Sequence, residues 1–258
     1  MKAHYHRAPA MTLVGVACCA AAAFAQLDRT PGQTYVYELT VTSNTQVDLS
    51  KLPAAVRGAV QANLAAGGTP TVYVVTATTG QVNADGSANV HVQFTNSRLP
   101  NSPVFARVNQ FDATLSPVGQ LLPTYDTNMR PSPNQMSEDQ MRNTTAQTID
   151  QQFATFNDFA GGCGKHGHLR TGDSWRVAST SRFSVAQYDL FAVTGVAGPV
   201  AVVTMKGGYS SSGGSNNFEA TGHYDMARRL VLDLHVAQTF QNAAASSGTS
   251  TMDYRLRE

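Results

Sequence analysis

Apolar and polar residues alternate along most of the chain, a pattern that predicts β-strands. In residues 89–94 the alternation is strict, with His91 and Gln93 each set between apolar neighbours. Other segments are rich in β-branched and aromatic residues, which favour strands. The predicted strands are 34–42, 71–79, 89–94, 175–185, 188–194, 200–205, 218–224, 230–240 and 251–256. Strands that alternate in this way give each sheet one apolar face, and another layer has to cover that face.

Two segments follow helical spacing instead. In residues 52–66 leucine or valine recurs at every fourth position, and a glycine pair follows. A second helix is predicted to begin at Ser137, which has capping-box spacing to Gln140, and to end at Gly161-Gly162. The apolar stripe of this second helix, which we expect to pack in the core, is Met141, Ile149, Phe153, Phe156 and Phe159.

Two short motifs occur twice along the chain. GQTY at 32–35 is similar to GDSW at 172–175, and FDAT at 111–114 is similar to FEAT at 218–221. The sequence therefore predicts pseudo-repeats over 32–122 and 172–258, joined by a linker and helix over 123–171. The fold class is mainly β (α+β): two linked antiparallel meanders with a crossover helix and one inserted helix. They would form either a curved half-barrel or a sandwich.

The same motifs carry a resemblance to known proteins. GQTY at 32–35, FDATLSPVGQ at 111–120 and GDSW at 172–175 resemble the openings and turns of uncharacterised families of secreted bacterial envelope β-proteins. More distantly, the pattern is similar to half-barrel lipoprotein carriers, in which a curved antiparallel sheet holds helices over an apolar cavity. The resemblance implies a single β-rich unit and an exported protein, and it carries over no catalytic residue.

The first 25 residues have the features of a secretory signal. Lys2 and Arg7 precede an apolar run at 12–23, and Ala23-Phe24-Ala25 is a small-x-small cleavage site. That run is shorter than the roughly 20 residues of a membrane-spanning helix, so no transmembrane segment is expected in the mature chain, 26–258. The alternative is lipidation at Cys18, which would attach the protein to the outer membrane. Either way we expect a periplasmic or extracellular protein.

Charge is nearly balanced, with 18 Lys and Arg against 17 Asp and Glu. No cluster of basic residues marks a phosphate-binding face, which argues against nucleic acid as a partner. Charged residues are 14% of the chain, below the typical value of about 25%. Serine, threonine, asparagine and glutamine supply much of the polar surface instead, which suits the solvent-facing sides of sheets.

The segment GGCGKHGHLR at 161–170 holds the most unusual chemistry of the sequence. Cys163, His166 and His168 are three donors of the kinds that bind zinc or copper, and Lys165 would lower the pKa of the thiol. Against this, four glycines make the segment flexible. The alternative is therefore an exposed crossover loop that leads into the strand beginning at Trp175.

Two further features suggest catalysis only weakly. Asp112 and Glu219 occupy matching places in the repeated motifs, but each alternates with apolar residues and is expected to face water. GYSSS at 208–212 lacks the second glycine of a nucleophile elbow and is predicted to be a turn.

The sequence thus favours a non-enzymatic binding or structural module of the cell envelope, with a lipid or another apolar molecule as the candidate ligand. One alternative is a metal or redox protein that uses Cys163, His166 and His168. The other is a hydrolase whose residues converge only in the fold.

Overall fold

A computed structural model of the chain describes most residues after the predicted leader. The described residues are 29–51, 54–55, 57–58, 61, 68–97, 108–129, 136–178, 188–211, 214–242 and 246–257. The predicted signal and its cleavage and lipidation sites lie outside them, as do residues 179–185 of the strand predicted at 175–185. No helix in the described part of the chain is long and apolar enough to cross a bilayer.

The strands form one antiparallel sheet of eleven, in the order β5-β4-β3-β2-β1-β11-β10-β9-β8-β7-β6. Their bounds are β1 Thr34–Val47, β2 Thr71–Val82, β3 Ala88–Asn96, β4 Gln110–Leu115, β5 Leu121–Pro123, β6 Ser174–Ala178, β7 Tyr188–Ala197, β8 Val200–Ser211, β9 Gly214–Asp225, β10 Leu230–Asn242 and β11 Ser246–Arg257. β1 to β5 make one meander and β6 to β11 the other, and the pairing of β1 with β11 joins them.

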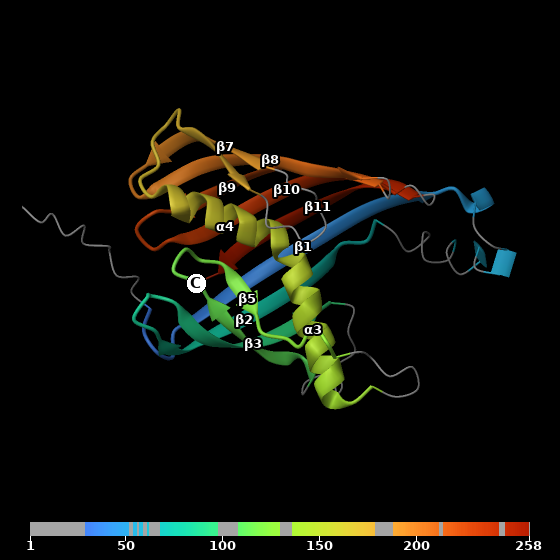
Figure 1. The fold of residues 1–258 in the computed structure, drawn as a ribbon, viewed down its shortest axis with the longest axis horizontal. Coiled ribbons are helices and arrows are strands. Elements are labelled where there is room, and N and C mark those ends of the chain that lie inside the picture. The colour runs from blue at the N-terminus through green and yellow to red at the C-terminus, as the bar shows by residue number, and fades with distance from the viewer. Residues whose placement is uncertain are drawn as a thin grey trace, which may run out of the picture.

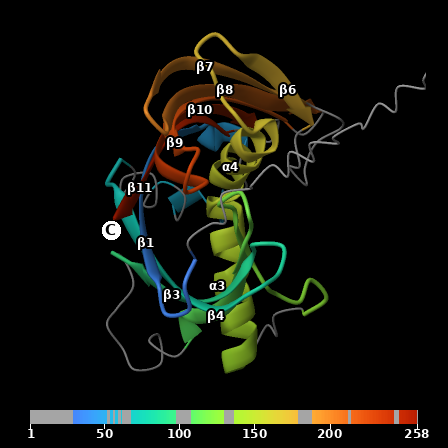
Figure 2. The same cartoon turned by 90° about the vertical axis from the view of Figure 1, so that its left-hand side faces the viewer.

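The sheet is open and strongly curved. β5 and β6 are its two edges, and Figure 2 shows the strands bending around the helices as an incomplete barrel. The predicted mainly β fold of two linked meanders is therefore confirmed, as one half-barrel sheet rather than two stacked layers. The segment that links the meanders crosses the concave face, as Figure 1 shows.

That segment holds two helices, α3 at Glu138–Gln152 and α4 at Ala154–His166, with Phe153 at the break between them. The predicted capping box is present, because Ser137 accepts a hydrogen bond from the Gln140 amide and the Gln140 side chain accepts one from the Ser137 amide. The predicted end of the helix at Gly161-Gly162 is wrong, since α4 continues through both glycines to His166.

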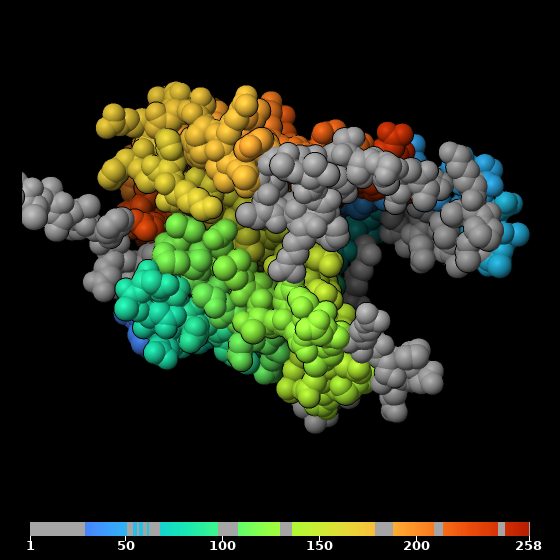
Figure 3. Space-filling view, in the orientation of Figure 1, coloured from blue at the N-terminus to red at the C-terminus, as the bar shows by residue number. Residues whose placement is uncertain are grey.

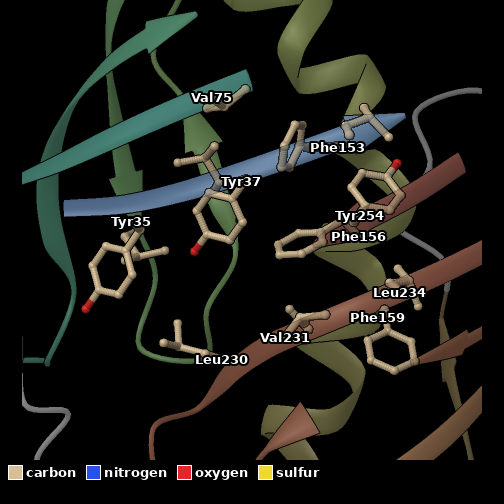
Figure 4. Close-up of a cluster of buried hydrophobic side chains, with 14 of the residues drawn as sticks. Tyr35, Tyr37, Val75, Phe153, Phe156, Phe159, Leu230, Val231, Leu234 and Tyr254 are labelled. Atoms are coloured by element: carbon tan, nitrogen blue, oxygen red, sulfur yellow. The ribbon is translucent and has the colours of Figure 1, made fainter. Parts of the chain in front are cut away.

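The core lies between these helices and the inner face of the sheet (Figure 4). Phe153 and Phe156 pack edge-to-face against Tyr37 of β1, with ring centroids 6.1 and 5.5 Å apart. Tyr254 of β11 contacts the same two phenylalanines at 5.5 and 5.4 Å. Burial of each such ring contributes about 1.5–3 kcal/mol, so this aromatic layer fixes the helices across the line where the meanders join.

The two meanders begin with the same turn. Gly32 and Gly172 have φ of 85° and 93°, a conformation that glycine adopts without strain. In each turn the glycine N–H donates to a carbonyl oxygen on the second strand of its meander, which is β2 or β7. The N–H of that same strand residue donates to the carbonyl oxygen of the residue after the glycine. The bonds are Gly32 N to Thr79 O (2.7 Å), Thr79 N to Gln33 O (2.8 Å), Gly172 N to Val193 O (2.9 Å) and Val193 N to Asp173 O (2.9 Å). These matched turns are what a duplication over 32–122 and 172–258 requires, and the duplication stays a prediction.

The inserted helix predicted at 52–66 is described only in part. Residues 54, 55, 57, 58 and 61 are helical and exposed, and the 3-10 turn η1 (Leu49–Lys51) precedes them. The leucines and valines on which the prediction rests lie outside the described residues.

Candidate functional site

As far as His166 the cysteine–histidine segment is the end of helix α4, packed on the sheet, and residues 167–170 form the connection toward β6. Three of its four glycines, Gly161, Gly162 and Gly164, are sites of close approach. A Cβ added to Gly162 would lie 2.2 Å from the ring of Phe191, and one added to Gly164 would lie 2.3 Å from Val118. The predicted flexible ribbon is therefore wrong, because glycine here lets the last turns of α4 lie directly against side chains from β7 and from the turn after β4.

The three candidate metal ligands face different surroundings. Cys163 is completely buried in the core, while His168 is exposed. The imidazole of His166 stacks on Trp175, with ring centroids 4.3 Å apart, and its Nε2 lies 3.8 Å from Asp173. Among the residues that the structure describes, no group of three or more histidine, cysteine and acidic side chains could hold a metal ion. The structure thus does not bring these three together as a ligand set.

The thiol of Cys163 is also shielded from solvent. Desolvation by burial raises its pKa well above the ordinary value, so the thiol stays protonated. The predicted lowering by Lys165 is wrong, because Lys165 is exposed while the thiol faces the core. Trp175 stacks on Phe191, with ring centroids 5.1 Å apart, and packs against the core.

The weaker catalytic candidates are separate features of the outer face. Asp112 pairs with His91 of the neighbouring strand at 3.2 Å, and Glu219 pairs with Lys206 at 2.9 Å. Both acids are exposed, as predicted. The GYSSS segment was predicted to be a turn, but β8 continues to Ser211 before β9 begins. It leads into a strand and not a helix, so it has no nucleophile-elbow geometry.

A groove of about 600 Å³ lies at the far end of the long central strands. Exposed residues alternate there with inner-facing ones, which places most of the lining on the outer face of the sheet. The strand register arranges eight of the lining residues as two rows across β1, β11, β10 and β9. One row is Asn44, Thr249, Thr239 and Asn217, and the other is Gln46, Ser247, Gln241 and Ser215.

In the part of the chain that the structure describes, the groove is lined by polar, uncharged residues together with Phe240 and Gly248, and no acidic or basic side chain is among them. With strands about 4.8 Å apart, each row spans about 14 Å. Amides both donate and accept hydrogen bonds, and so do hydroxyls, so the two rows present a grid of mixed hydrogen-bonding capacity. Its volume falls in the range of roughly 300–1,000 Å³ usual for ligand sites.

A second polar feature lies inside the half-barrel, at the opposite end of β1. Arg29, just before that strand, is 5% exposed and donates to three carbonyl oxygens. These bonds run from Nη1 to Gly86 O (3.0 Å) and Leu115 O (2.7 Å) and from Nη2 to Ser116 O (2.5 Å). Burial lowers the pKa of the guanidinium, while nearby tyrosines, Tyr35, Tyr37 and Tyr224, act in the opposite direction.

Asp189 on β7 is a third feature with unusual electrostatics. It is 2% exposed and faces the inner side of the sheet. Its Oδ1 occupies the space beside Gly207, where an added Cβ would lie 2.2 Å from it. Desolvation, with a smaller contribution from the Asp158 carboxylate on α4, raises the pKa of Asp189 to about 7. A carboxyl group between sheet and helix therefore titrates near neutral pH.

Sequence reasoning missed all three of these features. The groove depends on which strands become neighbours, and Arg29 and Asp189 are single residues outside any motif. No protein-family model matches the chain, and no curated protein sequence matches it. The resemblance to secreted envelope families therefore stays a prediction.

Proposed function

We propose that the protein is a non-enzymatic binding module of the cell envelope that holds a neutral, polyhydroxylated molecule, such as an oligosaccharide, in the outer groove. The observation that carries this proposal is the two-row grid of uncharged amides and hydroxyls that lines the groove, which has a volume of about 600 Å³. Export to the periplasm or the cell exterior is part of the proposal, on the basis of the signal-like N-terminal 25 residues.

The chemistry of the lining argues against the other ligand classes. A charged ligand would find no counter-charge among the described residues that line the groove. An apolar ligand would cover amides and hydroxyls without replacing their hydrogen bonds to water, at a cost of about 1–3 kcal/mol for each group left unpaired. A sugar, whose hydroxyl groups donate and accept, can satisfy both kinds of group at once.

An apolar ligand between sheet and helices is the competing proposal. In the described residues that space is occupied by Phe153, Phe156 and Phe159, each at most 1% exposed. A lipid would have to displace these rings and the α3–α4 segment with them. The groove needs no such rearrangement, which is why we place the ligand there.

Removal of two groove amides tests the proposal. Binding of neutral oligosaccharides from a glycan array is followed by titration calorimetry for the wild type and for Asn217→Ala/Gln241→Ala. Each lost hydrogen bond is worth about 0.5–1.5 kcal/mol, so we expect the double variant to bind about fivefold to 150-fold more weakly.

The matched control is Asn89→Ala/Gln93→Ala. It removes one asparagine and one glutamine from the exposed outer face of β3, well outside the groove lining. Control affinity should equal that of the wild type. Equal weakening in both double variants, or no binding of any neutral oligosaccharide by the wild type, would refute the groove as the ligand site.

A further inference from the structure

Unpartnered polar atoms gather at the inner end of the half-barrel, near the start of β1. Six buried side-chain nitrogen or oxygen atoms of the described residues have no hydrogen-bond partner. Four of them belong to this end: Arg29 Nε, Tyr37 Oη, Thr79 Oγ1 and Tyr224 Oη. Buried polar groups are nearly always hydrogen-bonded, so such a concentration requires an explanation.

The residues come from different elements but lie close together. Arg29 interacts electrostatically with Tyr37 of β1 and Tyr224 of β9. Thr79 of β2 accepts the backbone bond from the Gly32 turn, three residues after Arg29. Figure 4 shows the Tyr37 ring with its hydroxyl directed away from Phe153, toward the part of the core near Leu230. Both meanders therefore supply polar groups to one place.

The turn between β4 and β5 closes this end. Gly119 lies against the carbonyl of Arg229, where a Cβ would be 2.5 Å from the oxygen, and Val118 lies against Gly164 of α4. Figure 3 shows the atoms of this turn in continuous contact with those of α4. The turn thus covers this end of the cluster, and each of the four polar atoms is itself buried.

The charge at this place is positive and the free groups are donors. Arg29 takes part in none of the ion pairs among the described residues. Its terminal nitrogens donate to uncharged carbonyls, and its side-chain hydrogen bond with Tyr35 is to a neutral hydroxyl. Asp85, the carboxylate that interacts with it weakly, is exposed and accepts two bonds from Ser87. Asp225, beside Tyr224, accepts bonds from the amides of its own turn.

We propose that this buried cluster binds a small monovalent anion, of the size of a halide, which accepts hydrogen bonds from Arg29 Nε and from the hydroxyls of Tyr37 and Tyr224. An anion neutralises the buried guanidinium and satisfies donors from β1 and β9 at once. It would therefore link the two meanders at the end of the sheet opposite the groove. This site is independent of the proposed oligosaccharide ligand.

Bromide is the probe, because its anomalous scattering distinguishes it from water. Crystals of the full chain grown or soaked in sodium bromide should show an anomalous peak between Arg29, Tyr37 and Tyr224. In solution, an approximately tenfold increase in sodium bromide should raise the melting temperature of the wild type by more than that of Tyr37→Phe at the same salt concentration. A water molecule, or no density, at this position would overturn the proposal.

The variant Tyr37→Phe distinguishes a bound anion from a hydroxyl that is buried without any partner. If an anion is bound, loss of the hydroxyl should lower the melting temperature and abolish its dependence on bromide. If the hydroxyl is simply buried and unpaired, its removal should leave the protein equally or more stable, which would contradict the proposal.

Tyr254→Phe is the control, because Tyr254 is also buried and its hydroxyl donates to the carbonyl of Gln152 instead. This variant should lose stability yet keep both the bromide peak and the bromide dependence. Loss of bromide dependence in both variants would assign the effect to general destabilisation and would also overturn the proposal.

Discussion

At the scale of single residues, burial decides the chemistry of the side chains that first attract notice. Cys163 and Asp189 are both almost completely removed from solvent, and in both cases desolvation raises the pKa. For the thiol this favours the neutral, protonated form. For the carboxyl it means a group that changes charge near neutral pH. Neither outcome is visible in the sequence, because burial of one residue depends on what the fold packs around it.

The thiol of Cys163 should be unreactive in the native protein. With Cys18 and Cys19 changed to serine, a thiol-specific reagent such as Ellman's reagent should label the folded chain on the time scale of unfolding and label it at once in denaturant. Zinc and copper contents should be negligible and equal in this protein and in the further Cys163→Ser variant. Rapid native labelling, or metal lost with Cys163, would restore the metal or redox hypothesis.

Asp189 should make the fold less stable as the pH rises toward neutrality. Its pKa is raised from 3.8 to about 7, so the folded state holds a proton that the unfolded state releases near pH 4. The resulting stabilisation is complete below pH 4 and is lost as the pH rises through about 7. The free energy of unfolding, measured in urea, should fall less between pH 4 and 8 for Asp189→Asn than for the wild type. The two decreases should differ by on the order of 1–2 kcal/mol. Parallel pH profiles for wild type and variant would contradict this assignment.

At the scale of elements, strands were predictable and the end of the long helix was not. Strict alternation placed β3 within one or two residues of its observed bounds, Ala88–Asn96, because inner-facing residues have to be apolar. The helix was predicted to end at Gly161-Gly162 because glycine usually follows a helix. Here the two glycines lie inside α4, where their missing Cβ atoms permit contact with Phe191 and Gln120. Local propensity does not reveal a contact between α4 and a strand nearly thirty residues further along the chain.

Gly162→Ala tests this explanation of the glycines. In a solvent-facing helix the substitution would stabilise by up to about 1 kcal/mol, but here the new methyl group would meet the Phe191 ring. We expect a loss of about 1–3 kcal/mol in the free energy of unfolding, measured in urea. Gly195→Ala on β7 is the control, because its Cβ would make only ordinary contact, 3.9 Å from Val202. A Gly162→Ala protein at least as stable as the wild type would show that α4 does not pack in this way.

At the scale of the whole molecule, the sheet brings together residues far apart in the sequence. The fold class was predictable because strand periodicity and the two helical segments leave few ways to cover an apolar face. The groove was not, because Asn44 and Asn217 become members of one row only when β1 pairs with β11 and β11 with β10. Composition gave the one hint, an excess of uncharged polar residues, without saying where they would gather.

The account rests most heavily on the groove as the binding surface, and side-chain amide NMR tests it most directly. In ¹H–¹⁵N spectra titrated with the tightest-binding oligosaccharide of the array, the NH₂ signals of Asn44, Gln46, Asn217 and Gln241 should shift together and saturably. Those of Asn89 and Gln93 should stay in place. Shifts centred elsewhere on the sheet, or between the sheet and α3, would contradict the account.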